Sequence, residues 1–221
     1  MYSCILWDVD GTIADASAGI LPRLIEVFGS YGMTPPPAEE LSHWIGPPMY
    51  ESFQRYGMDA DRAADAVERY RRLAARDGYA ASVRIYPGVT EVLRAVAAAG
   101  IPQATASSKP ENQVVAILDH YGLSGLFTAI VGAQPGAEDK ASAIGRALEE
   151  LAARGADVTR PVLIGDRVHD IEGAAEYGIP VIFAEWGFGE PAEGAPAEYR
   201  AGSAEALLPL LVTDRASDPV S

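Results

Sequence analysis

Two aspartates lie two positions apart at the end of the first apolar segment of the chain. Residues 2–7 are mostly apolar, and residues 8–12 read DVDGT, in which Asp8 and Asp10 form the acidic pair. Such an apolar run is typical of a buried parallel strand, and α/β sheets bind ligands just beyond the carboxyl ends of these strands. Side chains two positions apart face the same way, so the two carboxylates should repel each other unless a proton or divalent cation lies between them. Taken alone, the same five residues would also fit a solvated turn.

A second acidic pair follows a later apolar strand, in the segment 165–170, which reads GDRVHD. Asp166 ends the strand, and Asp170 lies one helical turn further on and faces the same side. With Asp8 and Asp10, this makes four carboxylates expected at one edge of the sheet. Such a cluster needs a hard cation, and Mg²⁺ fits. Helix capping would explain Asp166 and Asp170 separately, but it would not explain four acids at one edge.

Three more polar side chains are placed to bind an anion near this edge. Ser107 follows the strand predicted over 101–106, where its hydroxyl and helix N–H groups suit a phosphate oxygen, although an ordinary N-cap would look the same. Lys140 opens a predicted helix, where the helix dipole disfavours a cation, and this favours a nearby anion over simple exposure to solvent. Lys109 could also reach a phosphate, but it lies past the expected binding turn. These two are the only lysines among 17 basic residues, which suggests that the compact lysine ammonium is needed there.

Alternating helical and apolar patterns position these residues. The expected strands are 2–7, 101–106, 129–132, 161–164 and 180–184, and the expected helices among them are 89–99, 111–121, 139–154, 170–177 and 204–211. This alternation predicts an α/β fold, a Rossmann-like doubly wound parallel sheet with right-handed crossovers and helices on both faces. The Gly- and Pro-rich stretch 186–197 is predicted to be a loop, and residues 213–221 a frayed tail.

Residues 16–83 carry helical patterns and no strand signal. Helices are expected near 20–28, 38–44, 49–56 and 61–76. The chain is therefore divided into a core, residues 1–15 and 84–221, and an all-helical cap, residues 16–83. Because this insertion directly follows the carboxyl end of the first strand, we expect it to overhang the carboxylates as a mobile lid.

Composition limits the choice of partners and compartment. A chain of 221 residues fits one large domain or a main domain with an insertion. The net charge of −14 argues against nucleic acid and anionic membranes as partners, but not against an anionic substrate at a local site. No apolar run is long enough to span a membrane, and the N-terminal run lacks the basic leader of a signal peptide. We therefore expect a cytoplasmic protein, monomeric or weakly dimeric, in which the lone Cys4 is a packing residue.

Taken together, these motifs resemble the four motifs of the haloacid dehalogenase-like hydrolases in order and in strand placement. They are the segment 8–12, Ser107, Lys140 and the acidic pair of 165–170. The helical insertion resembles the C1 cap of that superfamily. Four short segments resemble its phosphoglycolate phosphatase and 5′-nucleotidase-like branch: YPGV at 86–89, SSKP at 107–110, IGPP at 45–48 and GDRVHD at 165–170. The resemblance covers nearly the whole chain apart from the tail.

The resemblance implies a Mg²⁺-dependent phosphatase that acts on a small phosphorylated metabolite, of the phosphoglycolate or nucleoside monophosphate type. Asp8 would attack phosphorus and form an aspartyl-phosphate, and Asp10 would serve first as the acid and then as the base. The ion would be held by the carboxylates of Asp8 and Asp166 and by the backbone carbonyl of Asp10. Asp170 would act on the ion through one of its neighbouring ligands.

The same resemblance implies that Ser107, Ser108 and Lys140 hold the phosphoryl oxygens. Many relatives have Lys-Pro in the third motif, whereas here the chain reads EDKA around Lys140, so this motif is the least typical of the four. Whether Lys109 shares the phosphate with Lys140 is left open by the sequence.

Asp10 distinguishes between activities of the superfamily. Dehalogenases lack this second aspartate, because a halide leaves without a proton, and phosphonatases replace it too. The alkoxide of a phosphate ester needs the proton, so a phosphatase is favoured, with a phosphomutase as the alternative because mutases keep both acids. A receiver-like signalling module is less favoured because of the chain length, the helical insertion and the late acidic pair. The sequence leaves open the roles of Arg167 and His169, the other polar residues of the fourth motif.

Residues of the cap are expected to select the substrate. The candidates are His43 and Arg55, with Trp44 and Tyr50 near them in the chain. Surface or packing roles fit these side chains equally well. The sequence does not name the substrate itself.

Overall fold

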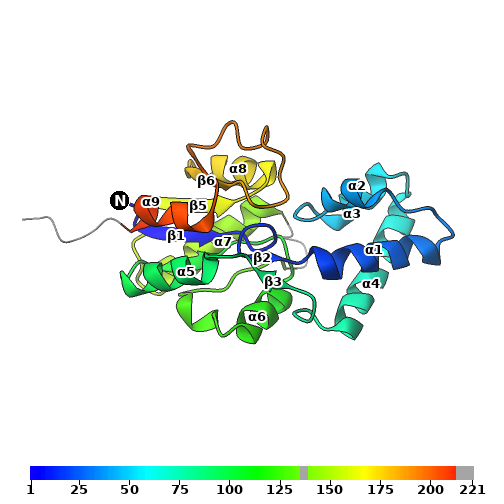
Figure 1. Cartoon of the computed structure of the whole chain (residues 1–221), viewed down its shortest axis with the longest axis horizontal. Helices are drawn as coiled ribbons and strands as arrows, with labels where there is room; N and C mark the ends of the chain where they lie inside the picture. Colours follow the sequence, from blue (N-terminus) through cyan, green and yellow to red (C-terminus); the bar gives the residue numbers. More distant parts are fainter. Residues whose placement is uncertain (135–138, 213–221) are drawn as a thin grey trace, which may run out of the picture.

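A five-stranded parallel sheet lies at the centre of the larger part of the molecule (Figure 1). The computed structural model describes residues 1–134 and 139–212. In spatial order the strands are β4 (Gln103–Thr105), β1 (Cys4–Trp7), β5 (Pro161–Gly165), β6 (Val181–Ala184) and β7 (Tyr199–Ala201). All neighbouring pairs run parallel, so the carboxyl ends of the strands lie at one edge of the sheet.

Helices cover both faces of this sheet. Alternate residues of β1 face opposite layers, with Ile5 and Trp7 in one apolar cluster and Cys4 and Leu6 in the other. The first layer contains α5 (Val89–Ala98), α6 (Glu111–His120), the 3₁₀ helices η1 (Ser124–Leu126) and η2 (Ala204–Leu207), and α9 (Leu208–Leu211). The second contains α7 (Lys140–Ala153) and α8 (Val168–Ala175). The predicted doubly wound α/β fold is confirmed.

Four helices form a separate group beside the sheet (Figure 1). They are α1 (Ser17–Ser30), α2 (Ala38–Ser42), α3 (Met49–Arg55) and α4 (Ala60–Asp77). The chain leaves the core through β2 (Ala14–Asp15) and returns through β3 (Arg84–Ile85), and the two strands pair in an antiparallel ribbon. The helical cap is thus connected to the core through these two paired strands. We keep the name cap for residues 16–83.

An aromatic cluster forms the interior of the cap. The ring of Phe28, on α1, lies 5.6 Å from that of Trp44, 5.7 Å from that of Phe53 and 5.2 Å from that of Tyr56, measured between centroids. These edge-to-face and tilted contacts are the favourable geometries for aromatic pairs. The cap therefore has its own apolar centre.

Some short elements differ from their prediction. Where a strand was expected over 129–132, only Ala129 forms an isolated bridge, to Ala104 on β4, and β7 follows the stretch predicted to be a loop. The two-residue strands of the ribbon were not predicted either, because two or three residues carry no measurable periodicity. Helix α8 begins at Val168 rather than at 170. The tail predicted over 213–221 lies outside the described residues. Among the helices of the described part, none is both long and apolar enough to cross a membrane.

Candidate functional site

Asp8 stands at the carboxyl end of the central strand β1. Its N–H donates to the carbonyl of Ile164 on β5 (2.9 Å), and the carbonyl of the preceding Trp7 accepts from Ala106 (2.7 Å). The backbone at this point is therefore held from both neighbouring strands. Asp8 is buried, with 4% of its surface exposed. A charged side chain so placed needs partners of opposite charge.

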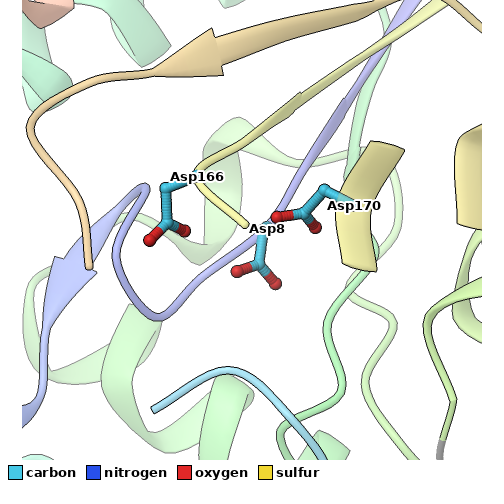
Figure 2. A group of neighbouring side chains, drawn as sticks. All are labelled: Asp8, Asp166 and Asp170. Carbon is cyan, nitrogen blue, oxygen red and sulfur yellow. The ribbon is translucent and has the colours of Figure 1, made fainter. Parts of the chain in front are cut away.

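Three carboxylates meet at this edge of the sheet. Asp8, Asp166 at the end of β5, and Asp170 in the first turn of α8 each offer an oxygen within 4.8 Å of the others (Figure 2). The sequence predicted four carboxylates in this group, and that prediction is wrong for the side chain of Asp10. That side chain does not join the group, and its Oδ2 lies 2.9 Å from Nζ of Lys109.

The motif at residues 8–12 also contacts the carboxylate of Asp166. The hydroxyl of Thr12 donates to Asp166 (3.1 Å), and the backbone N–H of Phe188 donates to its other oxygen (2.8 Å). Gly11 has a φ of +90°, and a Cβ there would lie 2.1 Å from Oδ2 of Asp166. Only glycine fits this position, both for its backbone conformation and for the space it leaves to the carboxylate. The contribution of Phe188 was missed, because backbone groups leave no trace in the side-chain pattern.

Lys140 is the counter-charge of the acidic group. Its Nζ lies 2.5 Å from Asp8 and 2.7 Å from Asp170, and it donates to the carbonyl of Ala106 at 2.9 Å. The anion expected near this helix start is thus present, in the form of two protein carboxylates. An ammonium has three N–H donors, and here three acceptors surround it. A phosphate that binds Lys140 must therefore compete with these protein groups.

Burial and charge shift the pKa values of the group. Burial raises the pKa of Asp8 to about 6, although the Lys140 ammonium acts in the opposite direction. Burial also raises the pKa of Asp166 well above its ordinary value, and the charge of Asp170 adds to the effect. For Lys140 burial lowers the pKa, but the carboxylates of Asp170 and Asp8 outweigh it, so its pKa is raised. Lys140 therefore stays protonated. When the three acids are ionised, they carry more negative charge than this one ammonium neutralises.

Lys109 and the two serines lie around the end of β4. Ser107 is buried, and its Oγ accepts from the backbone N–H of Lys109 at 3.2 Å. Ser108 and Lys109 line a cavity. Burial lowers the pKa of Lys109, but the neighbouring Asp10 carboxylate outweighs this and the pKa is raised. The structure thus brings Lys109 directly to Asp10, whereas the sequence ranked Lys109 second to Lys140 as a phosphate ligand.

A cavity of about 470 Å³ lies between cap and core. Its core side includes Asp10, Ser108, Lys109, Glu111, Asn112 and Gln113, and its cap side includes Ile20, Trp44, Pro47, Met49, Tyr50, Val67, Tyr70, Arg71 and Tyr79. Of the four cap candidates, Trp44 and Tyr50 line the cavity, and His43 and Arg55 are not among its described lining residues. Arg55 is exposed and donates to Glu51 on its own helix, and the His43 ring lies 3.8 Å from Glu190.

Comparison with known proteins identifies the family. A family model described as haloacid dehalogenase-like hydrolase matches residues 5–184. The chain belongs to this family. The prediction from the sequence motifs is therefore confirmed at the level of the haloacid dehalogenase-like hydrolases.

Individual known proteins resemble the chain along most of its length. It is 34% identical to a 5′-nucleotidase of Pseudomonas aeruginosa, over 87% of this chain and 86% of that protein. It is 31% identical to the tyrosine-protein kinase PtkA of Mycobacterium tuberculosis, over 84% of this chain but only 62% of that longer protein. The crystal structure of a predicted phosphatase from Clostridium acetobutylicum superposes with a TM-score of 0.86 at 28% identity, covering 94% and 96% of the two chains.

The acidic group fits the metal ion that this haloacid dehalogenase-like fold implies. Three buried carboxylates face one ammonium, so their ionised forms leave two negative charges without a counter-charge. Burial raises the pKa values of Asp8 and Asp166, and the neighbouring carboxylates raise them further. A divalent cation with a preference for oxygen ligands would balance the two negative charges, and carboxylates are the donors that Mg²⁺ prefers.

Proposed function

We propose that this protein is a Mg²⁺-dependent phosphatase that hydrolyses a small phosphomonoester through an aspartyl-phosphate on Asp8. The observation that carries the proposal is the position of Asp8, in contact with Lys140 and within the three-acid group at the end of the central strand. The Lys140 ammonium would attract an anionic substrate to the carboxylate of Asp8. Membership of a hydrolase family and similarity to a 5′-nucleotidase support the same reaction class.

The reaction would take place in two displacements. First, a carboxylate oxygen of Asp8 attacks phosphorus, the bond from phosphorus to the ester oxygen breaks, and Asp10 gives its proton to that oxygen. Then water attacks the same phosphorus, Asp10 takes the proton of that water, and the carboxylate of Asp8 leaves with its electron pair. Asp10 is suited to this exchange, because it lines the cavity and its buried Oδ1 has no hydrogen-bond partner among the described residues.

Other residues would hold the phosphoryl group and the ion. Ser107, Ser108 and Lys140 are proposed to bind phosphoryl oxygens, and Lys109 is close enough to Asp10 to share them. The carboxylates of Asp8 and Asp166 and the backbone carbonyl of Asp10 would hold Mg²⁺, with Asp170 orienting Lys140 beside them. When bound, the ion would neutralise charge on the transferred group.

The cavity favours a leaving group that carries a planar ring. Its cap side is rich in aromatic and apolar side chains, including Trp44, Tyr50 and Tyr79, on which a nucleobase or aryl ring can pack. Among its described lining residues the cations are Lys109, which pairs with Asp10, and Arg71, which donates to Glu68 at 2.7 Å. Nucleoside monophosphates therefore fit better than phosphoglycolate, whose carboxylate is a second anionic group beside the phosphate and needs a cation of its own.

Release of inorganic phosphate tests the proposal. The purified protein with Mg²⁺ is given a nucleoside 5′-monophosphate, an aryl phosphate and phosphoglycolate, with Asp8→Asn as the blank. Phosphate release with kcat/KM highest for the two ring-bearing esters is expected. A mutase or a kinase would pass the phosphoryl group to a hydroxyl acceptor instead of water, and phosphate release equal to the blank on all three substrates would refute the phosphatase.

The substrate preference is tested separately with Tyr50→Ala. Tyr50 lines the cavity and is 36% exposed, so its removal should leave the fold intact. KM for the ring-bearing esters should rise, and KM for phosphoglycolate should stay the same. Tyr199→Ala, an exposed tyrosine on the core strand β7, is the control. Equal effects of Tyr50→Ala on all three substrates would contradict ring packing.

A further inference from the structure

Arg167 connects the acidic group of the core with the cap. It follows Asp166 directly, is only 7% exposed, and its Nη1 donates to the carbonyls of Ile45 (2.6 Å) and His43 (3.2 Å). Both acceptors are backbone groups at the end of the short helix α2 and in the loop that follows it. A single core side chain therefore holds two cap carbonyls across the boundary between the two parts.

The core end of Arg167 is rigidly fixed. Its backbone N–H donates to Asp170 at 2.9 Å, and its Nε donates to the carboxylate of Glu193 at 3.1 Å. The same Glu193 oxygen accepts from the N–H of Val168 at 2.8 Å, so the acid is itself tied to the start of α8. A guanidinium that is planar and anchored on one side loses little further freedom when it binds on the other.

The cap end of the contact belongs to the wall of the cavity. Residues 45–48, which read IGPP, line that cavity, and Ile45 is buried. At Gly46, whose φ is +106°, a Cβ would lie 3.2 Å from Cγ of Arg167. The loop backbone thus packs against the arginine stem as well as its head. Displacement of Arg167 would move the wall that faces the substrate.

We propose that Arg167 is a positioning residue that clasps the cap loop 43–48 over the cavity, and that the clasp opens when substrate enters and product leaves. This inference rests on the proposed function for the identity of the substrate. The contact of Arg167 with the cap carbonyls is independent of that function. Hydrogen bonds to backbone carbonyls suit a reversible contact, because the freed groups can bind water when the cap moves away. An apolar contact of similar size would expose surface that water does not solvate. The paired strands of the ribbon, where the chain enters and leaves the cap, are the natural hinge.

Because Arg167 lies in the same segment as Asp166 and Asp170, its contact with the cap also affects the acidic group. The segment that carries these two carboxylates also carries the arginine, so closure of the cap and the geometry of the acidic group are set by the same turn between β5 and α8. A closed cap over a correctly placed acidic group excludes water from the first displacement. Arg167 does not itself need to touch the substrate for this effect.

The experiment compares Arg167→Gln, Arg167→Lys and Glu193→Gln with the wild type at saturating Mg²⁺. Loss of the guanidinium contacts in Arg167→Gln should raise KM for the ring-bearing ester by about tenfold or more, the scale for hydrogen bonds of a charged donor. Arg167→Lys should recover part of this, since an ammonium can still reach one carbonyl. Glu193→Gln should shift KM in the same direction, although Glu193 is not among the described residues that line the cavity. Arg154→Gln, an exposed arginine on the core, is the control.

Amide hydrogen exchange provides a readout that needs no turnover. In the substrate-free protein, Arg167→Gln should speed exchange within residues 43–48 and leave the strands β1 and β5 unchanged. A purely structural role would instead lower the thermal midpoint of the whole protein, with KM and local exchange unaltered. Unchanged KM together with unchanged exchange at 43–48 would overturn the clasp. If the wild type hydrolyses no phosphate ester, the proposed function fails, while the exchange measurement still decides the clasp.

Discussion

The ammonium of Lys140 lies 2.5 Å from a carboxylate oxygen of Asp8, although the two residues are 132 positions apart in the chain. The same ammonium lies 2.7 Å from Asp170, so one buried lysine serves two buried acids. Removal of one partner from a buried ion pair leaves the other charge without compensation, which is far more costly than the loss of a surface pair. Nζ of Lys140 therefore contributes both to the stability of the fold and to the proposed binding of the phosphoryl group.

The first prediction ranks the two lysines. Lys140→Ala should lower kcat/KM by roughly 10²-fold or more, the scale for loss of one preorganised charged donor. Lys140→Arg should fail almost as badly, because a planar fork cannot take the place of a compact ammonium among three close acceptors. Lys109→Ala should cost less, since Lys109 pairs with one carboxylate, that of Asp10, rather than two. Steady-state kinetics with a nucleoside 5′-monophosphate measures all three.

The opposite ranking would have a clear meaning. If Lys109→Ala were inactive while Lys140→Ala kept most of its kcat/KM, the phosphate would be bound at the cavity side by Lys109. Circular dichroism of both variants is the control for folding. It matters most for Lys140→Ala, which leaves two buried acids without their ammonium.

The sequence predicted the elements and the residues of the site better than their contacts. Long helices such as α1 and α4 follow from their apolar period, and the end of β1 follows from the change from apolar residues to Asp8. Lys140 was singled out because a cation at a helix start needs an anion, and the structure supplies that anion. Residue type and position along an element were enough for these inferences.

Contacts made by backbone groups or across the cap boundary could not be predicted. The N–H of Phe188 binds Asp166 from 22 residues further along the chain, and Arg167 binds cap carbonyls. In each contact one partner is a backbone group, which every residue type carries, so no pattern of residues indicates where that partner lies. The turn of Asp10 toward Lys109 likewise depends on the side-chain rotamer and on the exact path of the loop after β4.

A second prediction concerns the interior of the cap. Phe28→Ala removes a fully buried ring that contacts three other aromatic rings, and it should lower the free energy of unfolding by about 3–5 kcal/mol. Ile25→Ala, on the same helix but 47% exposed, should change it by less than about 0.5 kcal/mol. Urea denaturation followed by circular dichroism gives both values. Similar losses in the two variants would show that the aromatic cluster does not stabilise the cap.

A third prediction concerns the nucleophile. Asp8→Asn should abolish turnover, because an amide cannot attack phosphorus in this way. It should not lower the thermal midpoint of the metal-free protein, because Lys140 keeps Asp170 as its partner and the buried acidic group loses one of its negative charges. A rapid-quench assay with ³²P-labelled substrate should find phosphate attached to the wild type but not to the variant. If the variant kept a tenth of the wild-type rate, which corresponds to a rise of only about 1.4 kcal/mol in the activation barrier, Asp8 could not be the nucleophile.

The last prediction links Mg²⁺ to pH. The pKa of Asp8 is raised by burial to about 6 in the folded protein, and that of Asp166 is also raised, so the folded state holds more protons than the unfolded state above the ordinary carboxyl pKa. In the metal-free protein Asp8 therefore makes the free energy of unfolding fall as pH rises from about 4 through about 6, and Asp166 acts in the same direction. Mg²⁺ binds the ionised carboxylates, so it should raise the thermal midpoint more at about pH 8 than at about pH 5. Differential scanning fluorimetry with Mg²⁺ and with a chelator measures this, and Asp8→Asn, which lacks one of the two groups, should show a smaller difference. An equal Mg²⁺ effect at both pH values would mean that the ion does not bind at this acidic group.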